Sequence, residues 1–222
     1  MLTAQGLTQR FYLHGKRRTL FENLSFELPR GGRLGILGRN GQGKSTLIKI
    51  LGGVLAQTGG KVTWQMTSSW PLGFVGAFQG ALTGMDNIQF ISRIYRKPAS
   101  EIIRKTEEFA ELGPAVLTQP IKQYSTGMRA RLAFGLSLAI DFDCYLIDEV
   151  IAVGDAGFAA KCEHELFNKR GERAFIVASH DLNFIRAYCQ RALVIESGRA
   201  TMYDDVNEAT EVVDNLFRRE PA

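Results

Sequence analysis

The feature that most constrains the fold is a glycine-rich segment between an apolar run and a helical stretch. Leu34–Leu37 is an uninterrupted apolar run, typical of a strand buried on both faces. The segment that follows is Gly38, Arg39, Asn40, Gly41, Gln42, Gly43, Lys44, Ser45 and Thr46, and a helical pattern then runs to Leu51. This Gly-x4-Gly-Lys-Ser spacing after a strand and before a helix is the P-loop pattern, whose backbone N–H groups bind phosphate oxygens. We expect Lys44 to reach the β- and γ-phosphates and Ser45 to take one Mg²⁺ position.

The order of the other apolar runs predicts an α/β fold. Leu24–Leu28 alternates apolar and polar residues, which indicates a half-buried antiparallel strand. Later runs at Cys144–Ile147, Ala174–Ala178 and Ala192–Ile195 alternate with helical patterns at 158–169 and 182–189. A β-α-β-α-β order predicts a mainly parallel sheet with helical crossovers.

A helical insert separates the P-loop from the later strands. Thr83 and Asp86 have capping-box spacing, Pro98 breaks the first helix, and a second helix is predicted over about 101–112. We therefore expect one domain, with a core at 1–82 and 141–205, a helical subdomain at about 83–140, and a C-terminal helix at about 206–219.

Two adjacent acids end the apolar run that begins at Cys144. At the carboxyl end of a parallel strand, Asp148 and Glu149 would point toward the phosphate-binding crevice. Asp148 suits Mg²⁺ or its water ligands, and Glu149 suits the orientation and polarisation of an attacking water. Taken alone, the pair is equally compatible with two solvated acids in a loop; the P-loop favours the catalytic interpretation.

Charge is unevenly distributed along the chain. Residues 1–50 carry nine Lys and Arg against two Glu, so they hold +7 of a whole-chain charge of +4, and the remainder holds −3. The basic residues have no aromatic residues at stacking intervals among them, so we expect no nucleic-acid partner. For Lys16, Arg17 and Arg18 we expect a solvated hairpin tip.

The cysteine content and the lengths of the apolar stretches indicate a reducing compartment and no membrane-spanning helix. Cys144, Cys162 and Cys189 are widely spaced, which predicts small buried thiols in a reduced interior and no zinc or redox site. No apolar stretch approaches the ~18–20 residues of a spanning helix. The first residues lack a basic region followed by an apolar run, so we expect no secretory signal.

With the P-loop and the Asp148-Glu149 pair, the segment before those acids resembles the signature of the ABC transporter ATP-binding subunits. That signature is usually Leu-Ser-Gly-Gly-Gln and opens a helix of the helical subdomain. In this chain Ser125 and Gly127 match, whereas Thr126 and Met128 replace a glycine and the glutamine. A hydroxyl, a backbone N–H and a helix N-terminus remain available to a γ-phosphate. The resemblance, which covers nearly all of residues 2–218, implies a P-loop NTPase cassette with an N-terminal antiparallel β-subdomain.

Four more positions resemble functional positions of that family. Gln79 resembles the Q-loop glutamine, which contacts Mg²⁺ or water and moves with the transmembrane partner, and His180 resembles the switch histidine at a strand end. Asp155 resembles the D-loop, which spans the dimer interface. Phe11 resembles the aromatic residue that stacks on adenine; Tyr12 adjoins it, and because neighbouring strand residues face opposite sides, only one of the two can stack. We choose Phe11.

The resemblance also implies an assembly. The segments 69–74, 78–84 and 124–128 look like the corresponding segments of bacterial capsular polysaccharide exporters. This implies an ATPase that takes ATP and Mg²⁺, pairs head to tail with a second copy of itself, and drives a polytopic permease. It would act peripherally at the cytoplasmic face of the inner membrane and meet the polysaccharide only indirectly.

Other interpretations stay open at this point. An exporter of O-antigen or of a teichoic-acid-type polymer is the nearest alternative, although many O-antigen subunits carry an added carbohydrate-binding domain and we expect none here. A soluble P-loop kinase would share the P-loop but needs no signature or switch histidine. ABC proteins that act on DNA or ribosomes usually have two cassettes or a long coiled-coil insert, and neither fits.

Overall fold

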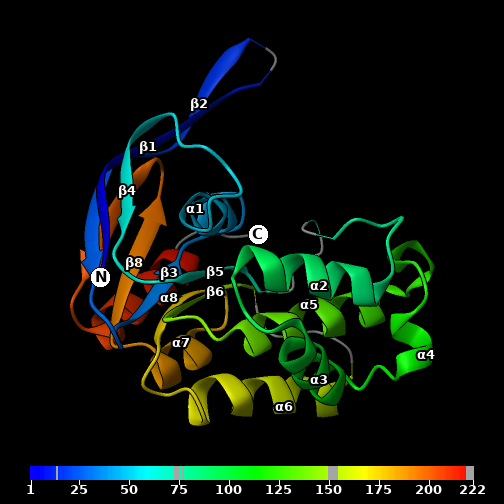
Figure 1. The fold of residues 1–222 in the computed structure, drawn as a ribbon. Coiled ribbons are helices and arrows are strands. Elements are labelled where there is room, and N and C mark those ends of the chain that lie inside the picture. The colour runs from blue at the N-terminus through cyan, green and yellow to red at the C-terminus, as the bar shows by residue number, and fades with distance from the viewer. Residues whose placement is uncertain (14, 73–75, 77, 150–154, 219–222) are drawn as a thin grey trace. The chain divides into compact units, whose positions relative to one another are not determined.

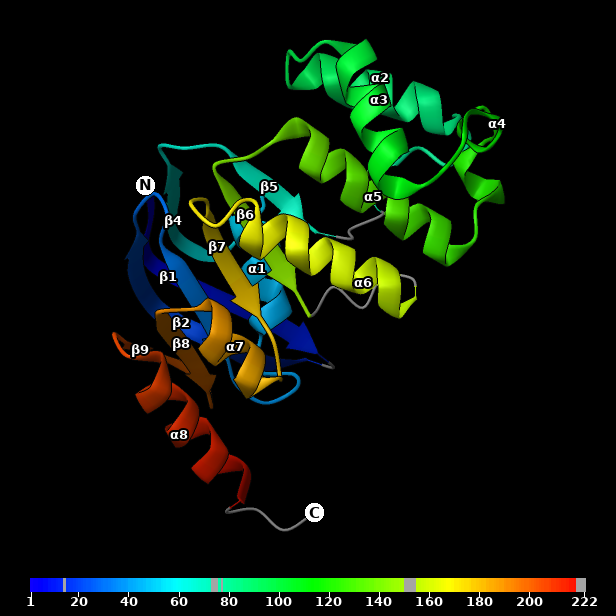
Figure 2. The same cartoon turned by 90° about the horizontal axis from the view of Figure 1, so that it is seen from below.

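The computed structural model describes residues 1–13, 15–72, 76, 78–149 and 155–218, drawn in Figures 1 and 2. The chain divides into two compact units. The first, here called the sheet unit, comprises Met1–Pro71, Asp143–Val150 and Gly171–Ala222. The second, the helical unit, comprises Leu72–Phe142 and Ile151–Arg170. The chain therefore leaves the sheet unit twice and returns to it twice.

Two sheets make up the β-structure of the sheet unit as far as it is described. A three-stranded antiparallel sheet has the order β2-β1-β4, and a six-stranded sheet has the order β5-β6-β7-β3-β8-β9. In the second sheet all pairs are parallel except β8 with β9. The strands are β1 (Leu2–Leu13), β2 (Lys16–Leu28), β3 (Arg33–Leu37), β4 (Gly59–Trp64), β5 (Ser68–Pro71), β6 (Cys144–Asp148), β7 (Ala174–Ala178), β8 (Arg191–Glu196) and β9 (Arg199–Tyr203). Both predictions, an antiparallel strand within 24–28 and a mainly parallel core sheet, are confirmed.

The apolar runs of the core strands explain their central place. In β3, β6 and β7 nearly every side chain is buried, as expected for strands covered on both faces. Helices α1 (Lys44–Leu51), α7 (Leu182–Tyr188) and α8 (Val206–Arg218) belong to this unit. A Cβ atom at Gly35 would lie 2.8 Å from Cγ2 of Ile185, so the absence of a side chain lets α7 pack directly on β3.

The helical unit is built from short capped helices. It contains α2 (Gly84–Ile94), α3 (Ala99–Ala110), α4 (Pro114–Leu117), the 3₁₀ turn η2 (Ile121–Gln123), α5 (Thr126–Ile140), α6 (Ala156–Glu163) and the π-helical turn η3 (His164–Asn168). The predicted capping box is confirmed, because Thr83 accepts a bond from the Asp86 N–H and the Asp86 carboxylate accepts one from the Thr83 N–H. α2 ends before Pro98, as predicted.

The boundaries of the units differ from the predicted ones. The sequence predicts that the helix over 158–169 belongs to the core, whereas α6 and η3 lie in the helical unit. Aromatic packing provides the reason, because the ring of Phe158 lies 5.5 Å from that of Phe109, which stacks at 5.8 Å on Phe134. This contact between α3, α5 and α6 involves residues far apart in the sequence, and no local pattern announces it.

One prediction from composition is also confirmed. The three cysteines are free and buried, as expected of small apolar side chains. Within the described part of the chain, no helix has the length and apolar character needed to cross a membrane.

Candidate functional site

The glycine-rich loop between β3 and α1 has the backbone that its sequence demands. Gly38, Gly41 and Gly43 have φ values of 143°, 77° and 109°, which disfavour residues with a side chain. A Cβ atom at Gly38 would lie 2.3 Å from the carbonyl oxygen of Ile195, so only glycine fits there. The loop therefore takes a compact path that leads into the N-terminus of α1.

Lys44 is held inside this loop. Its side chain is buried, and its Nζ donates to the carbonyl oxygens of Gly38 at 2.7 Å and Arg39 at 3.2 Å. Burial lowers the pKa of Lys44, while the nearby carboxylates of Glu149 and Asp148 raise it. The loop thus positions a cation where a phosphate chain would replace its own carbonyl groups as partners.

Asp148 ends β6 beside the same loop. Its Oδ1 is buried and has no hydrogen-bond partner among the described residues. Burial raises the pKa of Asp148, and a hydrogen bond from Ser45 lowers it in part. A buried carboxylate oxygen without a donor next to a hydroxyl is the hard oxygen pair that Mg²⁺ takes as ligands. Asp148 and Ser45 therefore fit the metal that the sequence predicts.

Glu149 and His180 meet at the ends of two neighbouring parallel strands. The carboxylate of Glu149, after β6, lies 3.9 Å from Nδ1 of His180, after β7, and both side chains are exposed. Glu149 has a φ of 42°, an uncommon value for a residue with a side chain, and its N–H donates to the Ala178 carbonyl at 2.9 Å. Strain of this kind is found at functional sites, where it aims a side chain.

A cavity of 290 Å³ lies between the P-loop and Glu149. It is lined by Leu20, Asn40, Gly41, Gly43, Lys44, Ser45, Thr46 and Glu149. The sequence predicts all of them except Leu20 of β2. A register shift between β1 and β2 at Gln9 and Arg10 allows Leu20 and Phe21, adjacent in the chain, both to be buried. No pattern in the sequence marks such a bulge.

Two side chains of the loop form hydrogen bonds with distant backbone groups of the same unit. Gln42 accepts a hydrogen bond from the Ser197 N–H at 3.1 Å, and Arg39 donates to the carbonyl oxygen of Leu216 in α8 at 3.4 Å. Both remain predicted nucleotide contacts through their backbone groups. Lys16, Arg17 and Arg18 of the hairpin are exposed, as predicted, and the guanidinium of Arg18 in addition donates to the Gly41 carbonyl at 2.9 Å.

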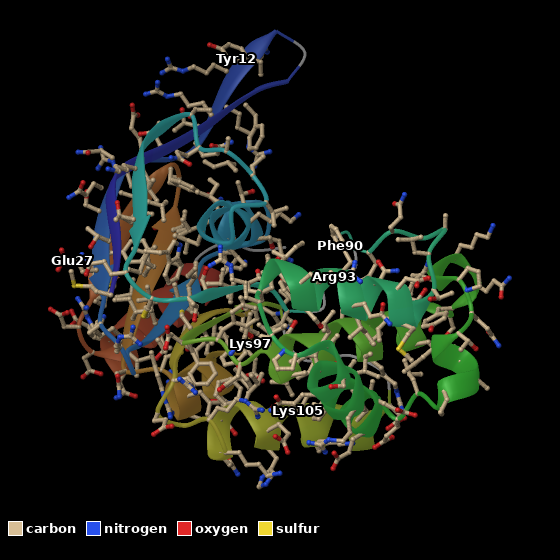
Figure 3. The ribbon with its side chains drawn as sticks, viewed as in Figure 1. Tyr12, Glu27, Phe90, Arg93, Lys97 and Lys105 are labelled. Carbon is tan, nitrogen blue, oxygen red and sulfur yellow. The ribbon has the colours of Figure 1, made fainter. Side chains whose placement is uncertain are left out.

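The hairpin of β1 and β2 carries the two candidates for adenine stacking. Phe11 pairs with Arg18 and Tyr12 with Arg17 across the hairpin. Their exposed fractions are 38% for Phe11 and 77% for Tyr12, which lies toward the far end of the hairpin (Figure 3). Directly opposed residues share a face of the sheet. Since Arg18 reaches the loop, the face that carries Phe11 is the one that looks toward the loop.

Gln79 belongs to the helical unit and is exposed there. Its N–H donates to Oδ1 of Asn87 at 2.8 Å, and its carbonyl accepts from Nδ2 of the same residue at 3.2 Å. Asn87 is buried in α2 and also bonds the Thr83 carbonyl. Asn87 is not among the residues predicted from the sequence, because a lone Asn within a helix carries no signal of such a role.

The signature segment forms the N-terminus of α5. The Oγ of Ser125 accepts a hydrogen bond from the Met128 N–H at 3.2 Å, which makes Ser125 the N-cap. Ser125 and Thr126 are exposed. A Cβ atom at Gly127 would meet only Ser125 Oγ, at 3.9 Å, so the surface beside it is open within this unit. The segment can present a hydroxyl and N–H groups to an outside ligand.

Asp155 has a similar place at the start of α6. Its carboxylate accepts from the Phe158 N–H at 2.9 Å and from Arg131 of α5 at 2.7 Å. Arg131 also bonds Glu111, which in turn bonds Lys161. The predicted D-loop segment covers residues 153–156, of which 153 and 154 lie outside the described residues.

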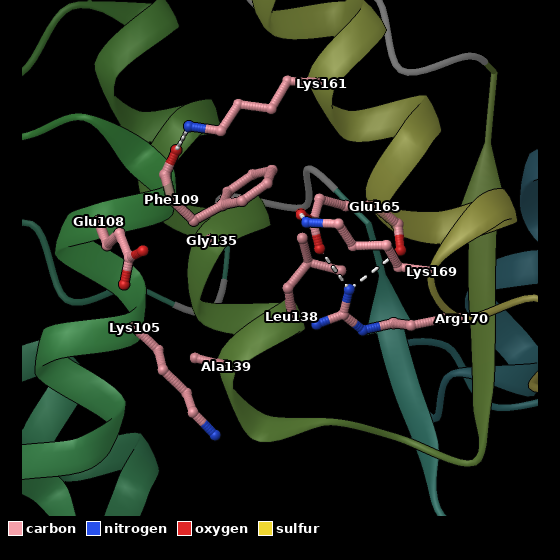
Figure 4. A pocket seen from close by; sticks show the side chains of 10 residues that line it. All are labelled: Lys105, Glu108, Phe109, Gly135, Leu138, Ala139, Lys161, Glu165, Lys169 and Arg170. Carbon is pink, nitrogen blue, oxygen red and sulfur yellow. Dashed lines mark hydrogen bonds and ion pairs between the residues drawn. The ribbon is translucent and has the colours of Figure 1, made fainter.

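A larger cavity, of 390 Å³, lies within the helical unit (Figure 4). Gly135, Leu138 and Phe109 form its apolar part. Its charged groups are largely engaged with one another or with nearby groups, since Arg170 bonds Glu165 at 2.8 Å, Lys169 also pairs with Glu165, and Lys161 bonds the Phe109 carbonyl. None of the predicted site residues lines it.

Comparisons with known proteins identify the family. The profile of the family described as "ABC transporter" matches residues 21–152. The capsule polysaccharide export ATP-binding protein CtrD of Neisseria meningitidis serogroup B is 49% identical over 216 residues, 97% of this chain and 100% of that protein. The ATP-binding protein BexA of Haemophilus influenzae is also 49% identical, over 94% of this chain and 96% of that protein.

A solved structure supports the fold independently. A dimeric ATP-binding cassette in a post-hydrolysis state, bound to ADP and Pi, superposes with a TM-score of 0.75 over 93% of this chain and 99% of that one, at 18% sequence identity. The P-loop, the paired acids at the end of β6, the matched profile and the near full-length relatives lead to one conclusion. The chain belongs to the ABC transporter family, as an ATP-binding cassette.

Proposed function

We propose that the chain is the ATP-hydrolysing subunit of an exporter for a capsular-type polysaccharide, working peripherally at the cytoplasmic face of a bacterial inner membrane. The observation that carries the ATPase assignment is the cavity in which Lys44, Ser45 and Glu149 meet. The polymer class is supported by the relatives named for capsule polysaccharide export, which align with nearly the whole chain.

The chemistry follows from the groups at this cavity. Lys44 is placed to neutralise the β- and γ-phosphates of ATP, together with the N–H groups of the loop. Glu149 accepts a proton from a water whose oxygen attacks the γ-phosphorus, while the bond to the bridging oxygen breaks and ADP leaves with that oxygen. His180, 3.9 Å from Glu149, is placed to hydrogen-bond the γ-phosphate and keep the water in line.

Ser45 and Asp148 would hold Mg²⁺, with Gln79 as a further candidate. When bound, the ion neutralises charge on the β- and γ-phosphate oxygens. The support for this assignment is the buried Oδ1 of Asp148, which no donor in the described residues satisfies. An unpartnered buried carboxylate oxygen is costly, so a ligand at that position stabilises the site.

A second copy of the chain would complete each nucleotide site. Ser125, Thr126, Gly127 and Met128 lie at the N-terminus of α5. Ser125 and Thr126 are exposed there, and among the described residues a Cβ atom at Gly127 would meet only Ser125 Oγ. In a head-to-tail pair these groups would meet the γ-phosphate held by the P-loop of the other copy. Asp155 would lie at the interface of that pair.

The membrane partner would dock on α2. Phe90 and Ile94 are 57% and 58% exposed, and their i, i+4 spacing puts them on one side of the helix, with Phe90 and Arg93 visible on its surface in Figure 3. Asn87 of the same helix holds both backbone groups of Gln79. A force on α2 would therefore move Gln79, the residue that resembles the Q-loop glutamine.

The test is complementation of an encapsulated strain that lacks its own export ATP-binding subunit. We expect the chain to restore surface polysaccharide and to co-purify with the polytopic subunit, and we expect Phe90→Asp to lose both. If the chain released inorganic phosphate from ATP but did not restore surface polysaccharide, the polysaccharide assignment would be rejected. Transfer of the phosphate to a soluble acceptor would instead support a P-loop kinase.

A further inference from the structure

The β1–β2 hairpin touches the P-loop at two points. Arg18 donates to the carbonyl oxygen of Gly41, and Leu20 lies so close to Gly43 that a Cβ atom there would be 3.1 Å from Leu20 Cβ. Gly41 and Gly43 are two of the three loop glycines with a positive φ. Strand β2 therefore contacts the two turns of the loop that shape its phosphate-binding path.

Arg18 contributes a directed polar contact between the hairpin and the loop. Its Nη2 lies 2.9 Å from the Gly41 oxygen, a normal hydrogen-bond length. A guanidinium is planar and holds its N–H groups in fixed directions, so the bond to the carbonyl also fixes the orientation of the Arg18 side chain. The length of the arginine side chain lets an exposed position on β2 reach across to the loop.

The register of the hairpin connects this contact to the base-binding side chain. Phe11 is the direct cross-strand neighbour of Arg18, with no register shift between Arg10 and Leu13. Because opposed residues share a face, a hydrogen bond that holds Arg18 on the loop also holds Phe11 toward it. Tyr12 and Arg17 form the next pair and face the other way.

We propose that Arg18 is a positioning residue that docks the hairpin onto the P-loop, so that the aromatic ring of Phe11 and the phosphate-binding loop engage one nucleotide together. This rests on the nucleotide site of the proposed function. Arg18 acts through Gly41 and Phe11, so its contribution falls mainly on ligands that contain a base. This preference for ligands that contain a base distinguishes Arg18 from a cation that only attracts phosphate.

The experiment compares the affinity of the purified chain for ATP and for inorganic tripolyphosphate, which has the phosphates but no base. Arg18→Ala is expected to weaken ATP binding by about fivefold and tripolyphosphate binding by less than about twofold. Arg17→Ala removes the same charge from the same hairpin on the opposite face, so it serves as the matched control and should bind both as the wild type does. Arg18→Lys should recover part of the ATP affinity.

Three results would overturn the inference. They are ATP binding by Arg18→Ala equal to that of the wild type, equal losses for ATP and tripolyphosphate, and an equal loss in Arg17→Ala. Tripolyphosphate binding also reports that the loop of each variant is folded. A wild-type chain that binds ATP but does not hydrolyse it would reject the ATPase proposal while the affinity ratios still decide the role of Arg18.

Discussion

The sheet unit and the helical unit hold their candidate functional residues by different means. Lys44 is buried in a loop closed by its own carbonyl groups, and Asp148 ends a strand buried on both sides. Ser125 and Asp155, by contrast, are exposed N-caps of α5 and α6. Each accepts a hydrogen bond from the turn that follows, and Asp155 also pairs with Arg131. The first unit has a cavity of 290 Å³ lined by Lys44, Ser45 and Glu149, whereas the second offers surface groups that need a ligand from outside.

This contrast explains a division of labour within one cassette. Sites formed by strand ends and glycine turns depend on the packing of a whole core, so they are pre-organised before a ligand arrives. Exposed helix N-termini carry free N–H groups and a partial positive charge at the surface, so they can bind an anion without a preformed cavity. A cycle of ATP binding and release needs both kinds of site.

The largest effect is expected in the sheet unit, at Glu149. Glu149→Gln should lower the rate of ATP hydrolysis by about 100-fold or more, because a general base contributes about that much, and should keep ATP binding. Measuring the turnover rate and the ATP affinity on the same preparation separates a loss of hydrolysis from a loss of binding. Glu196→Gln alters another acid at the end of a core strand and should hydrolyse ATP normally. If Glu149→Gln hydrolysed ATP at the wild-type rate, the assignment of Glu149 as the general base would be wrong.

A mixing experiment tests whether the helical unit acts on a second copy. Lys44→Ala disables the P-loop, and Gly127→Glu places a negative charge at the signature, where the open surface and the helix N-terminus tolerate it. Each variant alone should be inactive, and an equal mixture should regain about one quarter of the wild-type hydrolysis, since half the pairs contain one intact site. A mixture as inactive as its components would place the signature contact within one chain.

A smaller effect, on stability, is expected from Asp143 at the start of β6. The backbone N–H of Thr67, its hydroxyl and Arg30 bond the carboxylate, and they hold the pKa of Asp143 below its usual value. Asp143→Asn should lower the free energy of unfolding at neutral pH by about 1–2 kcal/mol. Because a lowered folded pKa gives stability above the unfolded pKa of about 3.9, the difference should shrink as the pH falls below about 4.

Chemical unfolding at several pH values measures this difference. Asp204→Asn is the control, since Asp204 also pairs with an arginine but its side chain is 87% exposed. Exposed pairs contribute little, so this variant should unfold like the wild type. A pH-independent loss in Asp143→Asn would assign the effect to packing.

The smallest effect is expected in the helical unit, at Asp155. Asp155→Ala removes the N-cap of α6 and the pair with Arg131, and should lower the thermal midpoint by about 2 °C. Asp155→Asn keeps a good N-cap and should change the midpoint by less than half as much. If the two variants were equally destabilised, the ion pair with Arg131 rather than the cap would hold this end of α6.

The sequence by itself determined the parts of the protein that depend on neighbours in the chain. Gly38, Gly41 and Gly43 require backbone angles that a side chain disfavours, and Thr83 with Asp86 closes a capping box within four residues. The apolar runs of β3 and β6 set which strands are buried. The family motifs follow from these local requirements, so they could be found without coordinates.

Only the tertiary structure decided what depends on segments brought together from far apart. The contact between Arg18 and Gly41 joins residues 23 positions apart, and it distinguishes the face of Phe11 from that of Tyr12. The place of α6 in the helical unit rests on the rings of Phe109 and Phe158, and Gln79 is tied to Asn87 by two bonds that no motif predicts. Such contacts arise from packing and strand register, which a linear pattern does not contain.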